Sequence, residues 1–271
     1  TGAMTFSSSV SGTTFTWTNN RTSIGLAASG SGNISTFNAA NATTAPVVAT
    51  ITVTPSANSC TGNAANYTIT VNPTPVLSSA TTATACDGVA FNYTATSATT
   101  GTTFSWTRAA VGTNGSASGS SASISETLVN TGTTTLTATY VFTLTANGCS
   151  NTQNVTVTIY PTATLTSTLT PAAICSGTAF SYTPTSATSG VTFSWTRATV
   201  AGISNAAGSG TGNPNETLTN TTDNPVNVTY VYTLGVGGCT NPSSYNVVVT
   251  VNPRPALSST LTPSAICNNT T

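Results

Sequence analysis

Apolar and polar residues alternate along most of this chain. From Leu136 to Leu144 every second position is apolar, and the alternation resumes at Val155, Val157 and Ile159 after a turn. A period of two, with Thr, Ser and Asn between the apolar residues, is typical of antiparallel strands that have one face buried and the other in water. No segment has the capped apolar stripe of an amphipathic helix. The pattern therefore predicts an all-β protein.

The alternating segments recur along the sequence. Successive tryptophans are 89 residues apart (106 − 17 and 195 − 106), and the cysteines recur at intervals of 89 to 92 residues. Self-similarity at a fixed period indicates tandem copies of one structural unit. The expected units are repeat 1 over 1–72, lacking its first strand, repeat 2 over 73–160, repeat 3 over 161–252, and the first strand of a following repeat over 253–271.

Each full repeat is predicted to contain about seven strands. The first strand precedes the first cysteine (76–84 and 165–170), and the third carries the motif Thr-Phe-Ser-Trp-Thr-Arg-Ala at 103–109 and 192–198. The aromatic residues of this motif share one face of the strand. We therefore interpret them as core residues, not as a surface that reads a ligand: Trp17, Trp106 and Trp195. A buried Trp on the third strand is the immunoglobulin-like arrangement, which predicts tandem immunoglobulin-like β-sandwiches in a linear array.

Charge is almost absent from the chain. Four arginines and four acidic residues balance to a net charge of zero, and there is neither lysine nor histidine. Nucleic-acid binding and attachment to anionic lipid both need clustered basic residues, so neither is expected. No apolar run approaches the ~20 residues of a transmembrane helix, and membrane insertion is not expected either.

The residue types that enzymes use are also missing. Nucleophilic catalysis usually needs a histidine base, and a glycosidase needs two neighbouring carboxylates. Glu126 and Glu216 occupy equivalent places in separate repeats, so they cannot share a site within one repeat. Without histidine and with so few carboxylates, zinc and calcium sites are not expected. We predict no catalysis, no metal and no cofactor.

One charged pattern repeats. Arg108 and Glu126 recur as Arg197 and Glu216. We interpret each pair as a structural ion pair between the end of the third strand and a later strand, which is worth only about 0–1 kcal/mol if exposed. The alternative is a contact with a ligand.

Several short motifs resemble a known class of bacterial repeat. They are Ile-Cys-Ser-Gly at Ile174–Gly177, Phe-Ser-Trp at Phe193–Trp195, Asn-Gly-Cys at Asn147–Cys149, and Val-Thr-Val-Asn-Pro at Val249–Pro253. The sequence is similar to the PKD-like and immunoglobulin-like repeats of very large surface proteins of Bacteroidetes bacteria. The resemblance covers essentially the whole chain. It implies an extracellular location at the bacterial cell surface and a place in the stalk of an adhesin or gliding-type protein exported by the type 9 system.

The six cysteines suggest disulfides formed in an oxidising compartment. The resemblance implies pairing within a repeat, because both cysteines recur once per unit in such proteins. This gives Cys86–Cys149 and Cys175–Cys239, and leaves Cys60 and Cys267 to partners outside the sequence. Pairing across the proline spacers, Cys60–Cys86, Cys149–Cys175 and Cys239–Cys267, remains open. In an ordinary sandwich the two cysteines of one repeat would lie at opposite ends, too far apart for a bond.

Two functional hypotheses follow. The first is a non-enzymatic extracellular spacer whose partners are its neighbouring repeats and whose ligand, if any, is unknown. The second is a filament subunit: the expected unpaired first strand at 253–271 would complete repeat 1 of the next copy, joining copies head to tail. A third reading, a carbohydrate-binding module, needs outward-facing aromatic residues, and the sequence predicts few.

Overall fold

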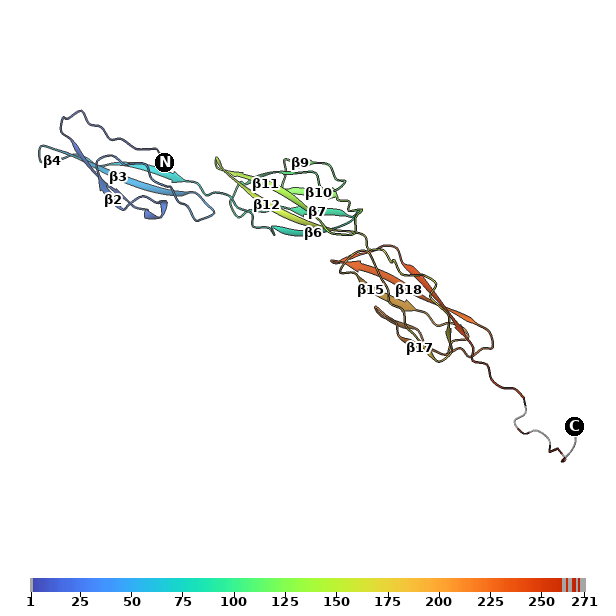
Figure 1. The fold of residues 1–271 in the computed structure, drawn as a ribbon. Helices are drawn as coiled ribbons and strands as arrows, with labels where there is room; N and C mark the ends of the chain where they lie inside the picture. Colours follow the sequence, from blue (N-terminus) through green and yellow to red (C-terminus); the bar gives the residue numbers. More distant parts are fainter. Residues whose placement is uncertain (1, 260–261, 263–264, 267, 269–271) are drawn as a thin grey trace. The chain divides into compact units, whose positions relative to one another are not determined.

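The computed structural model describes residues 2–259, 262, 265–266 and 268. These residues form three tandem β-sandwich domains (Figure 1), as the alternation predicts. They contain no α-helix, only one 3-10 turn. No helix among the described residues has both the length and the apolar character needed to cross a membrane.

Repeat 1 is built on one five-stranded sheet with the order β2-β1-β3-β4, in which β5 also pairs with β3. Its core contains Trp17, Ile24, Ile34 and Ile51, each at most 7% exposed. The elements are β1 (Thr14–Asn19), η1 (Thr22–Ile24), β2 (Ser29–Ser31), β3 (Val47–Ala57), β4 (Cys60–Thr61) and β5 (Ala65–Val71).

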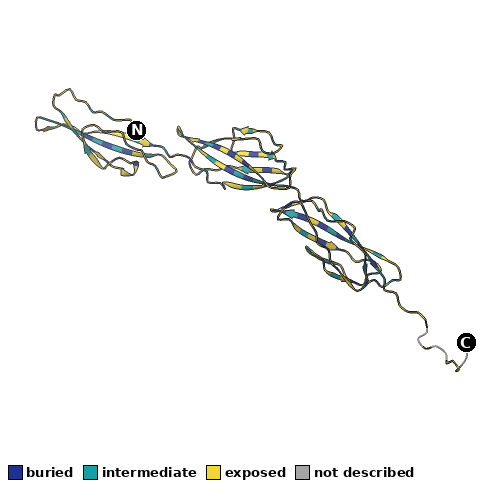
Figure 2. Ribbon diagram, viewed as in Figure 1, coloured by how far each residue is buried: buried dark blue, intermediate teal, exposed yellow. Residues whose placement is uncertain are grey.

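Repeat 2 packs a five-stranded sheet, β6-β12-β11-β8-β9, against the two-stranded sheet β10-β7. Burial alternates along the long strand β11, which Figure 2 shows as successive buried and exposed bands. The strands are β6 (Thr82–Cys86), β7 (Ala90–Thr94), β8 (Thr103–Arg108), β9 (Ala117–Gly119), β10 (Ser123–Thr127), β11 (Leu136–Ala146) and β12 (Cys149–Tyr160).

Repeat 3 repeats this plan with a six-stranded sheet, β13-β20-β18-β15-β16 with β19 on β18, facing the two-stranded sheet β14-β17. Its core is centred on Tyr230, Tyr232 and Leu234, which are fully buried. The strands are β13 (Ile174–Cys175), β14 (Thr178–Phe180), β15 (Thr192–Arg197), β16 (Gly208–Thr211), β17 (Glu216–Leu218), β18 (Val226–Val236), β19 (Cys239–Thr240) and β20 (Tyr245–Asn252).

The first strands differ from the prediction. Each carries its cysteine instead of preceding it, and 165–170 forms no strand. In repeat 3 this strand pairs in parallel with the last one, with Ile174 opposite Val251 and Cys175 opposite Asn252, whereas we expected antiparallel pairs only. Of the predicted extra strand at 253–271, residues 253–259 are not in a strand, and Cys267 lies outside the described residues.

Candidate functional site

The repeated Arg and Glu residues meet inside the sandwich and join its two sheets. Arg197 ends β15 on the large sheet, and Glu216 begins β17 on the small one. The Arg197 Nε and Nη2 atoms donate to Glu216 Oε2 and Oε1 at 2.8 and 2.9 Å. The Tyr230 hydroxyl, from β18, donates to Glu216 Oε2 at 2.7 Å. The Arg197 guanidinium also donates hydrogen bonds to the carbonyls of Ala198 and Ala206, so each of its three nitrogens has a partner.

Repeat 2 has the same cluster. Arg108 Nε and Nη2 lie 3.0 and 3.3 Å from the Glu126 carboxylate oxygens, and the Tyr140 hydroxyl donates to Glu126 Oε2. The Arg108 side chain is only 4% exposed and that of Arg197 only 1%, while the two glutamates are about one-fifth exposed (17% and 21%). The low value that applies to an exposed pair therefore does not apply here, because removing the partner of a buried guanidinium group leaves an uncompensated charge.

The pKa shifts follow from this packing. Hydrogen bonding to Arg197 lowers the pKa of Glu216, against the opposing effect of burial. Burial and then the hydrogen bond to the carboxylate raise the pKa of Tyr140 and of Tyr230. The tyrosines thus stay protonated as donors and the carboxylate stays charged as an acceptor. Both carboxylate oxygens are already engaged, so the cluster has no free group poised for acid–base chemistry.

Each tryptophan side chain packs closely against a glycine on the neighbouring strand. Trp17, Trp106 and Trp195 are 6–7% exposed and face Gly30, Gly119 and Gly210 in register. A Cβ built on these glycines would lie 2.2, 2.7 and 2.8 Å from the nearest indole atom, closer than packed atoms allow. The indole N–H groups are buried without a hydrogen-bond partner. The Trp of this motif is therefore a core residue in each repeat, and the Arg that follows it in repeats 2 and 3 is buried as well.

Sequence reasoning did not identify several of the residues that complete these interiors. Asn220 Nδ2 donates to the carbonyls of Asn224 and Val251 at 2.8 Å each, tying a loop to the last strand. Asn41 does the same in repeat 1, toward Ala45 and Val71. The available signal was the repeat period, at which these asparagines, the cluster tyrosines and the glycines all recur.

The disulfide pairing that we expected is wrong. Cys86 and Cys239 are disulfide-bonded, whereas Cys60, Cys149 and Cys175 are free thiols. Neither Cys86–Cys149 nor Cys175–Cys239 is therefore formed.

The sandwich geometry explains why the two cysteines of a repeat do not pair. In repeat 3, Cys239 lies opposite Val236 at one end of β18, and Cys175 lies beside the end of β20 that faces Val226. The ten residues from Val226 to Val236 span about 33 Å along a strand, whereas bridged Cα atoms are within about 7 Å. No movement short of unfolding would join them.

Three segments of the chain, 3–75, 83–163 and 172–255, match the PKD-like domain. This chain belongs to the PKD-like domain family. No curated protein matches it. Among solved structures, the FN1–FN3 domains of chicken CNTN1 are similar at 10% identity and a TM-score of 0.36, covering 92% of this chain and 93% of that one. Extracellular domains 3–5 of Drosophila OTK are similar at 11% identity and 0.35, covering 90% and 86%. A three-domain I-band fragment of titin is similar at 9% identity and 0.33, covering 91% and 89%.

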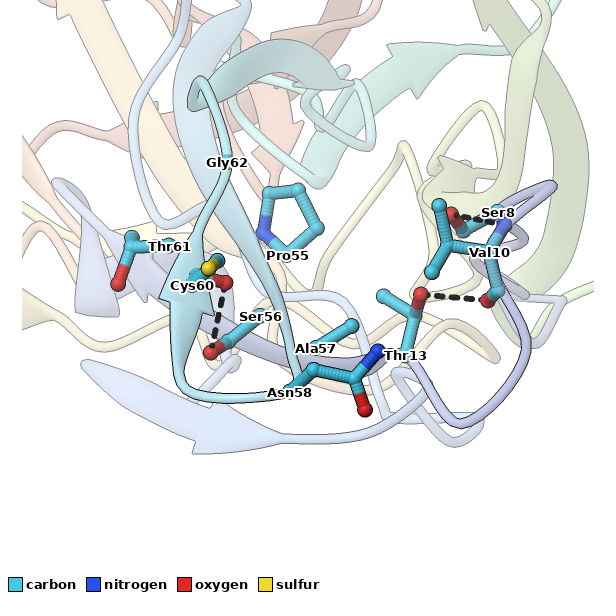
Figure 3. Close-up of a pocket in the computed structure, with 10 residues that line it drawn as sticks. All are labelled: Ser8, Val10, Thr13, Pro55, Ser56, Ala57, Asn58, Cys60, Thr61 and Gly62. Atoms are coloured by element: carbon cyan, nitrogen blue, oxygen red, sulfur yellow. Dashed lines mark hydrogen bonds between the residues drawn. The ribbon is translucent and has the colours of Figure 1, made fainter.

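A hollow of about 350 Å³ opens on the surface of the first PKD-like repeat (Figure 3). The loop containing Ser8, Val10 and Thr13 lines one side, and the hairpin from Pro55 to Gly62 lines the other. Its hydrogen bonds are local: Thr13 Oγ1 donates to the Val10 carbonyl, and Ser56 Oγ donates to that of Cys60. The exposed thiol of Cys60 is the one titratable side chain among its lining residues.

No group of three or more His, Cys, Asp or Glu residues that could hold a metal occurs in the described part of these PKD-like repeats. Among the residues that line the hollow in repeat 1, Cys60 offers a thiol and the others offer no titratable side chain, and the Arg, Glu and Tyr groups of the buried clusters are hydrogen-bonded to one another.

Proposed function

We propose that this chain is a non-enzymatic structural region of an extracellular protein, a stalk or spacer of a bacterial surface adhesin. One observation carries the proposal: the Trp and Arg residues of the repeated motif, which first suggested a surface that reads a ligand, are buried. The Arg–Glu–Tyr clusters and the Trp–Gly contacts recur at the same positions, and both lie in the cores. Repeats that recognised a ligand would be expected to repeat an exposed group instead.

The outward faces fit a spacer. On the strands they carry mainly Thr, Ser and Asn, and the chain has four cations and four anions in 271 residues. Such a surface stays hydrated while having little charge to attract a partner. The bacterial surface location rests on the resemblance to Bacteroidetes repeats, and disulfide-bonded cysteines suit an oxidising compartment.

A replacement experiment tests the spacer. In a surface protein that displays a binding domain beyond this chain, removing repeat 2 (73–160) should lower capture of a receptor recessed below a thick glycan layer. Replacing that repeat with an unrelated sandwich of the same length should restore capture, because a spacer contributes reach and not recognition. Failure of the replacement, together with saturable binding of the isolated chain to cells or glycans, would refute the proposal.

The alternative is a filament joined by strand donation. Light scattering separates the two: a mass near 26.9 kDa at all concentrations supports the spacer, and fibres that grow with concentration support assembly.

A further inference from the structure

The hairpin that closes repeat 2 turns through an Asn-Gly pair. Ala146 pairs with Cys149, so Asn147 and Gly148 are the two central residues of the turn. Both have positive φ angles, 51° and 78°, as in the type I′ turn that two-residue hairpins favour. Both are exposed, and a Cβ built on Gly148 would have open space around it. The described residues form a hydrogen bond with the Asn147 carbonyl but none with its side-chain amide.

A flip of one peptide group brings this amide onto the backbone. Rotation of the Asn147–Gly148 peptide converts the type I′ turn into type II′, the other turn that closes two-residue hairpins. The φ of Asn147 is compatible with both turns, and Gly148 takes φ of either sign without steric cost. The type II′ turn has ψ of about −120° at its first central residue, which aligns the Cα–Cβ bond of Asn147 with the C–N bond that follows. The Asn147 Cγ atom can then reach the Gly148 nitrogen in a five-membered ring.

We propose that Asn147, and not the Asn of the chain's other Asn-Gly pair, is a self-modification site. The Gly148 nitrogen passes its proton to water and attacks the Asn147 Cγ atom, and the side-chain nitrogen leaves as ammonia. A bond from the backbone nitrogen to Cγ replaces the amide bond and closes a succinimide ring. Water then opens the ring at either carbonyl, which gives aspartate or isoaspartate. Asparagine is a thermolabile residue, and this reaction needs only water.

The other Asn-Gly pair, Asn114-Gly115, is held away from this reaction. Asn114 Nδ2 donates to the carbonyls of Val111 and Val129 at 3.0 and 2.8 Å, and its Oδ1 accepts from the Val129 amide at 2.9 Å. Both ends of the side-chain amide are bound, so all three bonds must break before it can turn toward the Gly115 nitrogen. Each such bond is worth a factor of roughly 2 to 10 in an equilibrium, so Asn114 should react at least about tenfold more slowly than Asn147.

The equivalent hairpin turns of the other repeats provide matched comparisons. In repeat 1 the turn is Asn58-Ser59, with φ angles of 49° and 64°. It has the same conformation, but the Ser59 side chain crowds the nitrogen that would attack, whereas glycine has no Cβ. In repeat 3 the turn is Gly237-Gly238, which has no side-chain amide. The fold therefore accepts several residue pairs at this turn, and only the pair in repeat 2 combines an exposed amide with a following glycine.

Conversion of Asn147 changes both charge and backbone. It adds one carboxylate to a chain whose formal net charge is zero. Isoaspartate also adds one CH₂ group to the backbone between Ala146 and Cys149, whose pairing closes the hairpin. Because the reaction needs neither an enzyme nor a cofactor, the modified fraction rises with the age of the molecule.

Ageing of the purified chain tests the proposal. The chain has no lysine, so trypsin releases one peptide, 109–197, that contains both Asn114 and Asn147. The folded protein is kept in warm, mildly alkaline buffer, and samples are denatured and digested briefly in mildly acidic buffer. Mass spectrometry with electron-transfer fragmentation then distinguishes isoaspartate from aspartate. Isoaspartate should accumulate at Asn147, with at least about tenfold less at Asn114. Equal conversion at the two sites, or an unchanged Asn147, would overturn the proposal.

Two controls separate the effect of the fold from that of the local sequence. In urea the hydrogen bonds of Asn114 are lost, so Asn114 and Asn147 should convert at similar rates; a difference that persisted would overturn the role given to the fold. Gly148→Ser should slow conversion of Asn147 severalfold, and the reciprocal Ser59→Gly should accelerate conversion of Asn58. Unchanged rates in both variants would exclude attack by the backbone nitrogen. The assay reports on the modification alone, so it can fail while the spacer function stands.

Discussion

Replacing Glu216 by Gln tests whether the buried cluster holds the two sheets of repeat 3 together. The carboxylate accepts three hydrogen bonds, two from Arg197 and one from Tyr230, at 2.7–2.9 Å. Gln keeps one acceptor oxygen but replaces the other with an amide nitrogen, which is a donor and cannot accept a bond from Arg197 or Tyr230. It also leaves the positive charge of a guanidinium that is 1% exposed without a counterion.

The cost can be bounded from these contacts. Removing one partner of a buried ion pair typically costs about 3–5 kcal/mol. The amide oxygen of Gln preserves part of the bonding, so we expect the low end, about 3 kcal/mol, in the free energy of unfolding of repeat 3. At tenfold per ~1.4 kcal/mol, the open population of that repeat should rise roughly 150-fold.

Native-state proteolysis measures this change one repeat at a time. Arg197 and Arg108 are both buried, so trypsin can cut after each only when its own repeat opens. When reclosing is faster than cleavage, the cutting rate follows the open population. Glu216→Gln should accelerate cutting after Arg197 by roughly 150-fold and leave cutting after Arg108 unchanged, and Glu126→Gln should do the reverse. Equal rates in wild type and variant would refute the idea that the cluster clamps the sheets.

Three further predictions concern the same interiors. Because the folded-state pKa of Glu216 lies below its usual value of 4.5, its contribution to the stability of repeat 3 is present above about pH 4.5 and is lost as the pH falls through the lowered pKa. Calorimetry from pH 6 to 3 should therefore show the unfolding temperature of repeat 3 falling, and falling less in Glu216→Gln. Gly119→Ala should cost about 1–3 kcal/mol of repeat 2 stability by overpacking Trp106, while Gly115→Ala, with open space around its Cβ, should leave the urea midpoint unchanged. Asn220→Ala removes two bonds to carbonyls, and a loss of about 1–3 kcal/mol should appear as faster cutting within repeat 3.

The sequence pattern predicted the fold well because the repeat and the alternation are both explicit in it. An apolar residue at every second position, three times over, leaves few alternatives to tandem sandwiches. The motif around Trp106 also shows which face of its strand is buried. The exact start of the first strand was wrong, since 165–170 has the apolar residues of a strand but makes only isolated backbone bonds, such as Val248 N to the Leu169 carbonyl.

The site was harder to predict because its main properties are long-range. Arg197 and Glu216 occur at the same places in the repeat as Arg108 and Glu126, which suggested a pair. Their burial, however, depends on how the two sheets pack and on the contact with Tyr230, and no local sequence pattern specifies either. The disulfide prediction failed for a related reason. Cys175 and Cys239 each recur once per repeat, but this recurrence says nothing about the distance between them.

The parallel pairing of the first and last strands of repeat 3 has a mechanical consequence. Tension on the chain pulls the start of β13 one way and the end of β20 the other, along the common strand axis. The bonds that join Ile174 and Cys175 to the last strand are then sheared together, whereas a hairpin pulled at its open end loses its bonds one at a time. Force applied along the polypeptide therefore loads these bonds of repeat 3 at the same time.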